Sequence, residues 1–276
     1  MMTALLAILA RWGAVGHMII GAAAAAALPA EMPQFFRASA DQLTYLDPEP
    51  DRWRNHADTA MDDAFAYDHY IDLERVSASA LAAHDRFDYL DTLRQSSVNA
   101  KGAGLLPFRI EELTERLRVE FRLWRVTPDP RTRGCIEQRI VNDAGILGHY
   151  VADGSNPHHT TIHYDGWVGD NPHGYTTAHG FHARFEAIYV QSHFKQGDIP
   201  VTAAPRVIAA LRPGILDYLK ESNSKVTQLY ELDKRAPFDS TTTDPEDRRF
   251  AAERLTAGAT MLRDLWWTAW VTSANP

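Results

Sequence analysis

The chain has few of the residues on which several common kinds of protein chemistry depend. Cys135 is its only cysteine, so an intramolecular disulfide is excluded, and a zinc site would need histidine and carboxylate ligands instead of thiolates. The longest alanine-rich apolar run, residues 22–28, is too short to span a membrane. Glycine-rich phosphate loops and a G-x-S-x-G motif are also lacking, which argues against nucleotide-driven chemistry and a serine nucleophile.

The net charge of −8 and the pI of about 5.8 argue against strong binding to the backbone of duplex DNA. They do not exclude an enzyme that handles a phosphodiester through metal ions. Hydrophobic residues make up 45% and charged residues 23% of the 276 positions, enough for a sizeable core. The sequence contains no internal repeat, low-complexity linker or alternating strand series. We therefore expect an all-α protein with one multi-helix domain at residues 12–276.

Residues 1–11, MMTALLAILAR, resemble the end of a secretory signal peptide but lack its basic start and its small residue before the cleavage point. A mis-assigned start codon with a longer leader explains this pattern, and so does an uncleaved protein. We interpret residues 1–11 as a signal-peptide remnant and expect a secreted or periplasmic protein.

Helical periodicity is visible along most of the chain. Residues 57–74 are ambiguous between a helix and a short strand, and residues 81–106 are predicted to form a looping excursion. Helices are predicted at residues 12–28, 109–126, 131–151, 177–194, 203–232 and 245–271.

Seven of the twelve histidines lie between residues 149 and 186. His149 and Asp153 are four residues apart, as are His182 and Glu186, so each pair would share one face of a helix. Prolines and glycines interrupt the stretch between the pairs, which is therefore predicted to be a loop. Two such pairs joined by a histidine-bearing loop favour a polynuclear zinc site.

His159, six residues beyond Asp153, could reach a second ion, whereas its neighbour His158 should point elsewhere. Two further residues have ordinary interpretations when taken alone. His17 could be a buried or capping histidine of a core helix, and Asp51, between charged neighbours, could form a surface ion pair.

Five short motifs in order resemble the zinc-dependent phospholipase C and S1/P1 nuclease superfamily, and in particular its bacterial phospholipase C-like branch. They span residues 12–186, about two-thirds of the chain. The motifs are WGAVGH at residues 12–17, HYID at 69–72, H-x3-D at His149 and Asp153, P-x-H at Pro157 and His159, and H-x3-E at His182 and Glu186.

The resemblance implies an α-helical domain with three zinc ions. One ion would be held by His17 and by the α-amine and carbonyl oxygen of Trp12. A second would be held by Asp51, His69 and His149, with Asp153 bridging these two ions. A third would be held by His159, His182 and Glu186. Asp51 would be either a ligand or the catalytic general base.

Two departures from the family pattern bear on this assignment. Ser155 stands where the nuclease branch commonly has a histidine, and Asn156-Pro157-His158 replaces a nuclease-like Gln-Pro-Leu. If residues 1–11 are retained, the nitrogen of Trp12 is an amide and cannot coordinate, so that one zinc site would be weakened.

The activity implied is hydrolysis of a phosphodiester by a metal-bridging hydroxide that attacks phosphorus. A phospholipase C-like enzyme acting on phospholipids is the first hypothesis, favoured by Glu186 and by the His149-Tyr150 pair. A nuclease for single-stranded nucleic acid, with the same three-zinc site, is the alternative. A non-catalytic helical protein stabilised by zinc is the third. No stable protein partner is predicted.

Overall fold

The computed structural model describes residues 13–54 and 57–274, and throughout these ranges the chain forms helices and loops without a β-strand. Two isolated β-bridges join Ile71 to Gly104 and Tyr164 to Gly166. The predicted all-α class is therefore confirmed. The helices are α1 (Gly13–Ala26), α2 (Gln34–Ala38), α3 (Ala40–Leu46), α4 (Glu49–Arg52), α5 (Thr59–Phe65), η1 (Ala66–His69), η2 (Leu73–Arg75), α6 (Ala78–Leu81), α7 (Arg86–Gln95), α8 (Ala100–Ala103), α9 (Leu106–Val126), α10 (Pro130–Ser155), η3 (Pro157–Thr160), α11 (Phe181–Ala183), η4 (Arg184–Tyr189), α12 (Val190–His193), α13 (Leu211–Asn223), α14 (Val226–Arg235) and α15 (Pro245–Thr272).

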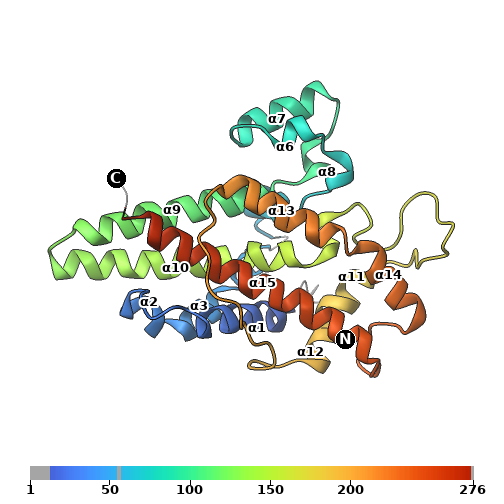
Figure 1. The fold of residues 1–276 in the computed structure, drawn as a ribbon. Helices are drawn as coiled ribbons and strands as arrows, with labels where there is room; N and C mark the ends of the chain where they lie inside the picture. Colours follow the sequence, from blue (N-terminus) through green and yellow to red (C-terminus); the bar gives the residue numbers. More distant parts are fainter. Residues whose placement is uncertain (1–12, 55–56, 275–276) are drawn as a thin grey trace, which may run out of the picture.

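Helix α10 is the central element, packed against α9, α15, α3, α13 and α1. Figure 1 shows α9 and α15 running beside it. The Asp129 carboxylate caps its first turn by accepting from the backbone N–H of Thr132 at 2.8 Å, and Pro130 occupies the first helical position. The predicted apolar stripe is fully or almost fully buried; it comprises Ile136, Ile140, Ala144, Leu147 and Val151. This packing fixes the C-terminal half of α10, which carries His149 and Asp153.

Helices α1 and α15 complete the packing around α10, and they also contact each other. Ile19, Ile20 and Ala24 of α1 are at most 1% exposed, and Trp266 of α15 is fully buried. The indole N–H of Trp266 donates to the backbone oxygen of Ala144 on α10 at 3.2 Å. These contacts hold the start of α1 beside the end of α10, although the two segments are far apart in the sequence.

The structure corrects two of the predicted elements and decides a third that the sequence left ambiguous. The helix predicted at 177–194 begins only at Phe181, because Gly180 adopts a left-handed backbone conformation with φ of 95°. It then passes through a π-helical turn, η4. The segment 203–232 is not one helix, since residues 203–210 are not helical and α13 and α14 are separate. Residues 57–74 form α5, η1 and η2, with a single bridge at Ile71 in place of a strand.

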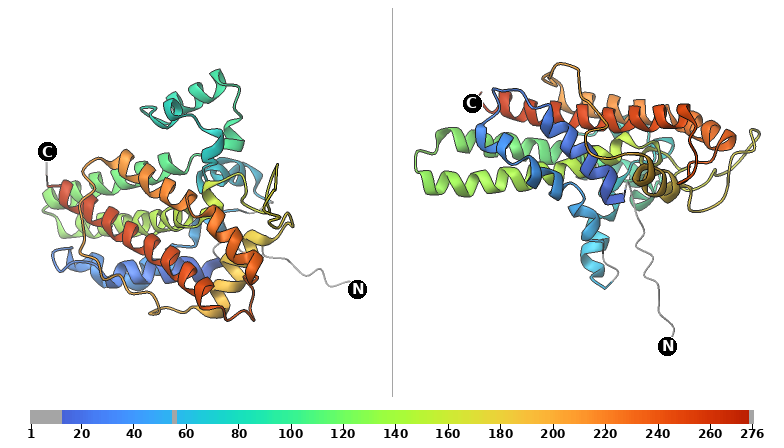
Figure 2. Two further views of the ribbon diagram at one scale, coloured as in Figure 1. Left: turned by 45° about the vertical axis from the view of Figure 1, so that its right-hand side comes forward. Right: turned by 90° about the horizontal axis from the view of Figure 1, so that it is seen from below.

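The excursion predicted between residues 81 and 106 contains the end of α6 and the short helices α7 and α8, which project from the helical body (Figures 1 and 2). Across the described residues, none of the helices combines the length and the apolar character that a membrane crossing requires.

Candidate metal centre

Three groups of potential metal ligands lie together near the C-terminal end of α10. Within each group the ligand atoms are within 4.8 Å of one another. The groups are His17, His149 and Asp153; Asp51, His69 and His149; and His159, His182 and Glu186. They come from α1, α4, η1, α10, η3, α11 and η4, so segments from both halves of the sequence are needed to assemble them.

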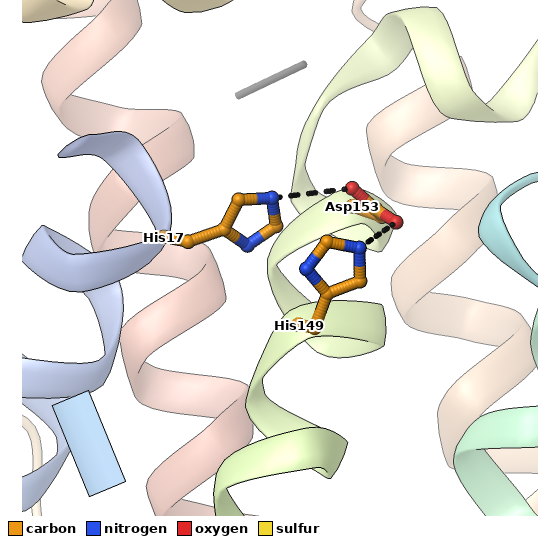
Figure 3. Close-up of side chains that lie close together, drawn as sticks. All are labelled: His17, His149 and Asp153. Atoms are coloured by element: carbon orange, nitrogen blue, oxygen red, sulfur yellow. Dashed lines mark ion pairs between the residues drawn. The ribbon is translucent and has the colours of Figure 1, made fainter. Parts of the chain in front are cut away.

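In the first group, two imidazole rings from different helices stack on each other and face the same carboxylate (Figure 3). The rings of His17 and His149 have centroids 4.1 Å apart and are inclined by only 14°. His17 Nε2 lies 3.6 Å from Asp153 Oδ1, and His149 Nε2 lies 3.3 Å from Asp153 Oδ2. All three side chains are fully buried.

The second group shares His149 with the first. His69 Nδ1 lies 2.9 Å from His149 Nε2 and 3.0 Å from Asp153 Oδ2. Asp51 Oδ1 lies 3.9 Å from His149 Nε2, and its side chain is 23% exposed. Asp153 therefore lies between the two groups, with one oxygen directed at His17 and the other at His69 and His149.

The third group also reaches Asp153, because His159 Nε2 lies 3.6 Å from Asp153 Oδ1. His182 Nε2 is 2.8 Å from Glu186 Oε2 and 3.1 Å from His159 Nε2, while His159 Nε2 is 3.4 Å from the same glutamate oxygen. The four-residue spacing of His182 and Glu186 spans the change from α11 to the π-helical turn η4. The sequence predicted that these two side chains share a face, and the structure brings them into contact.

Hydrogen bonds to the backbone orient two of the imidazoles. His149 Nδ1 lies 2.9 Å from the Asp47 carbonyl oxygen, and His159 Nδ1 lies 2.7 Å from the His69 carbonyl oxygen. A carbonyl can only accept, so each Nδ1 carries a hydrogen, and Nε2 is the nitrogen that faces the site and can bind a metal once it has no proton. This is the arrangement found around metal-binding histidines.

Burial and the neighbouring charges determine the protonation of the metal-free site. Burial lowers the pKa of His17 well below its ordinary value. For His159, burial is outweighed by Asp153 and Glu186, which raise the pKa to about 9. Burial alone would raise the pKa of Glu186, but His182 and His159 lower it to about 2. The Glu186 carboxylate is thus ionised at neutral pH, as a metal ligand must be.

The donor set and its spacing fit zinc. Two ligands of a tetrahedral zinc ion, each at about 2.0–2.1 Å from the metal, lie about 3.3 Å from one another, close to several of the separations above. Asp153 Oδ1 is buried and accepts no hydrogen bond from any residue in the described ranges, yet His17 Nε2 and His159 Nε2 each lie 3.6 Å from it. A cation among these atoms would satisfy an oxygen that is otherwise costly to bury.

A cavity of about 490 Å³ opens beside the ligand groups, with His69, His159 and His182 in its wall. Its remaining lining is rich in cations and tyrosines, including Arg54, Arg75, Lys101, Tyr67, Tyr70 and Tyr164. The cavity is large enough for a small organic phosphate group and its substituents.

Eight of the nine predicted ligands are brought together, and Trp12 lies outside the described residues, as do residues 1–11. His158 belongs to none of the three groups; its ring packs edge-on against Phe181, with centroids 4.8 Å apart. Sequence reasoning missed Asp47, which contacts two ligand histidines, and the contact of Asn156 Nδ2 with Glu186 Oε2 at 3.0 Å. Asp47 and Asn156 each stand directly before a proline, and nothing in the local sequence indicated that either contacts a ligand residue.

Comparison with known proteins yields no matching family model and no matching curated protein. Among solved structures, the chain is similar to the alpha-toxin of Clostridium perfringens from avian strain SWCP, with 14% sequence identity and a TM-score of 0.46. The alignment covers 95% of this chain, which spans 65% of the toxin chain.

Proposed function

We propose that the protein is a zinc-dependent phosphodiester hydrolase of the phospholipase C type, with three zinc ions. The observation that carries the proposal is the convergence of His17, His69 and His149 on Asp153 in a buried site that opens to a cavity. Zinc bound there would supply a coordinated water of lowered pKa and a Lewis acid for the phosphoryl oxygens.

The residues of the chain have distinct roles in this proposal. Asp153 would hold two metal ions, since its two oxygens face different histidines. His159, His182 and Glu186 hold the third position. Trp12 joins His17 if residues 1–11 are removed. Asp51 is a ligand or the group that accepts a proton, and its 23% exposure gives it a route to solvent that the fully buried Asp153 lacks.

Open coordination positions distinguish this proposal from a purely structural zinc site. A structural zinc usually has four protein ligands, whereas a catalytic zinc keeps a position for water or substrate. The nine proposed ligands cannot supply four each to three ions, even with one shared carboxylate. A non-catalytic protein stabilised by zinc is therefore the weaker hypothesis.

A nuclease for single-stranded nucleic acid is the second candidate, and the cavity lining favours it. Tyr67, Tyr70 and Tyr164 are the kind of side chain on which bases stack. The cations could follow a phosphate backbone, but they are largely neutralised by aspartates: Arg75 lies 3.1 Å from Asp72, and Arg54 lies 3.5 Å from Asp62. Because these cations already pair with aspartates and are poorly placed to bind a long phosphate backbone, a phospholipid remains the first candidate substrate.

The test uses purified protein with its zinc content measured by elemental analysis and its mature N-terminus sequenced. Activity is then measured on phosphatidylcholine vesicles and on single-stranded DNA. We expect close to three zinc ions per chain and release of a phosphorylated head group from the lipid. Cleavage of DNA alone would favour the nuclease. One zinc or fewer per chain, with no hydrolysis of either substrate, would overturn the proposal.

A further inference from the structure

Asp47, directly after α3, contacts both stacked histidines on the side opposite Asp153. Its side-chain Oδ1 lies 3.1 Å from His17 Nδ1, and its backbone oxygen lies 2.9 Å from His149 Nδ1. Asp47 is 1% exposed. The two rings are therefore held between two aspartates: Asp47 faces both Nδ1 atoms, and Asp153 faces both Nε2 atoms.

Two glycines on different helices make the space for the Asp47 carboxylate. A Cβ atom added to Gly21 of α1 would lie 2.7 Å from Asp47 Oδ2, and one added to Gly148 of α10 would lie 2.6 Å from the same oxygen. Both separations are far below van der Waals contact. Any other residue at position 21 or 148 would push against the carboxylate, so α1 and α10 approach closely enough for one residue to contact both ligand histidines.

We propose that Asp47 is a positioning residue that sets the tautomer and ring orientation of two zinc ligands, His17 by its side chain and His149 by its backbone carbonyl. With hydrogen on each Nδ1, both rings present an Nε2 lone pair toward Asp153. The two ligands serve two different metal positions, so a single residue orders ligands for both. This inference rests on the proposed zinc-binding function and adds a residue to it.

The division between side chain and backbone makes the proposal specific. Replacing Asp47 by alanine removes the partner of His17 but keeps the carbonyl that holds His149. Asp47→Ala should therefore weaken binding of one zinc ion by about 10- to 100-fold, the usual effect of losing such an orienting partner, and leave the other ions bound. Asp47→Asn keeps an oxygen that can accept from His17 and should largely restore the affinity.

The experiment titrates metal-free protein with Zn²⁺ in competition with a chromophoric chelator, for the wild type and the Asp47→Ala and Asp47→Asn variants. Nitrogen NMR of ¹⁵N-histidine-labelled, metal-free protein reports the tautomers independently of metal. We expect Nδ1–H in both histidines of the wild type. In Asp47→Ala we expect a mixture at His17 and no change at His149. An Nε2–H form of His17 in the wild type would overturn the proposal, even if Asp47→Ala fails to fold.

A double-mutant cycle tests whether Gly148 makes room for the Asp47 carboxylate. Gly148→Ala should lower the melting temperature in the wild type and less so in Asp47→Ala, where the carboxylate is gone. Equal losses of melting temperature in both backgrounds would show that Gly148 is not needed to make room for the carboxylate.

For the zinc titration, Asp264→Asn is the matched control, because Asp264 is also 1% exposed but pairs with Arg263 and Arg206. Its zinc affinity should not change.

The outcomes separate the two proposals. If wild-type protein binds no Zn²⁺ tightly, the proposed function fails. If the wild type binds Zn²⁺ and Asp47→Ala binds it equally well with unchanged tautomers, only the role of Asp47 fails.

Discussion

At the residue scale, Asp153 is the buried carboxylate on which four histidines converge. It is fully buried, and nitrogens of four imidazoles lie 3.0–3.6 Å from its two oxygens. Burial would raise the pKa of its carboxyl, but His159 and His149 hold that pKa well below its ordinary value. An ionised carboxylate in such a place needs several positive or hydrogen-bonding neighbours, which the imidazoles and a bound cation would together provide.

Asp153→Asn should abolish hydrolysis and lower the zinc content, because an amide cannot bridge two cations as a carboxylate does. We expect activity to fall by more than about 100-fold, which exceeds the usual effect of altering a residue that only hydrogen-bonds to a metal ligand. Elemental analysis and the lipid assay would check this. Asp143→Asn, on the same helix but outside the three ligand groups, is the control. Normal zinc content in Asp153→Asn would contradict the bridging role.

At the element scale, α15 shows how the start of a helix can bury a carboxyl group. The Asp244 side chain caps α15 by accepting from the N–H of Glu246 at 2.8 Å. Asp247, in the first turn of the helix, is fully buried, and Arg235 Nη2 lies 3.4 Å from its Oδ1. Burial and the nearby Asp244 raise the pKa of Asp247 to about 7, against the opposing effect of Arg235.

This pKa has a direct consequence for stability. Between pH 4 and 7 the unfolded chain loses the Asp247 proton while the folded chain keeps it, so the free energy of unfolding falls as the pH rises. Asp247→Asn removes this contribution. We expect the difference in free energy of unfolding, variant minus wild type, to increase by about 1 kcal/mol or more when the pH is raised from 4 to 8. Urea unfolding at both pH values would measure it, and a difference independent of pH would contradict the prediction.

At the scale of the whole molecule, the proposed zinc ions connect α1, α4 and η1 to α10, η3 and α11, so metal binding and folding should be linked. A ligand that binds only the folded state at 100 times its dissociation constant adds about 2.7 kcal/mol of stability. The predicted single domain at 12–276 is consistent with one continuous hydrophobic core in the described residues, and it stays a prediction.

Removal of zinc with a chelator should lower the melting temperature by about 5 °C or more, since a chain of this size changes by about 2–4 °C per kcal/mol. Adding Zn²⁺ back should restore it, whereas Mg²⁺, which prefers oxygen ligands, should not. Differential scanning calorimetry would measure both steps. The response should be much smaller in Asp153→Asn. An unchanged melting temperature would show that no zinc links these helices.

The sequence by itself determined the features that depend on local periodicity. The buried stripe of α10 follows from apolar residues at helical spacing, and the pairs His149–Asp153 and His182–Glu186 follow from the four-residue turn. The motif resemblance supplied His17, Asp51 and His69, which no local pattern connects to α10. The ligand role of Trp12, the count of three zinc ions, the role of Asp51, export and the substrate stay predictions.

Only the tertiary structure decided which other side chains reach the site. Asp47 contacts His17 and His149 because α1, α3 and α10 pack together, and two glycines whose role is invisible in sequence allow that approach. The tyrosines and cations of the cavity come from short helices and loops, among them η1, η2 and α8, whose positions depend on long-range contacts. Periodicity carries no information about such contacts, since it describes the face of one helix and not the neighbour that covers it.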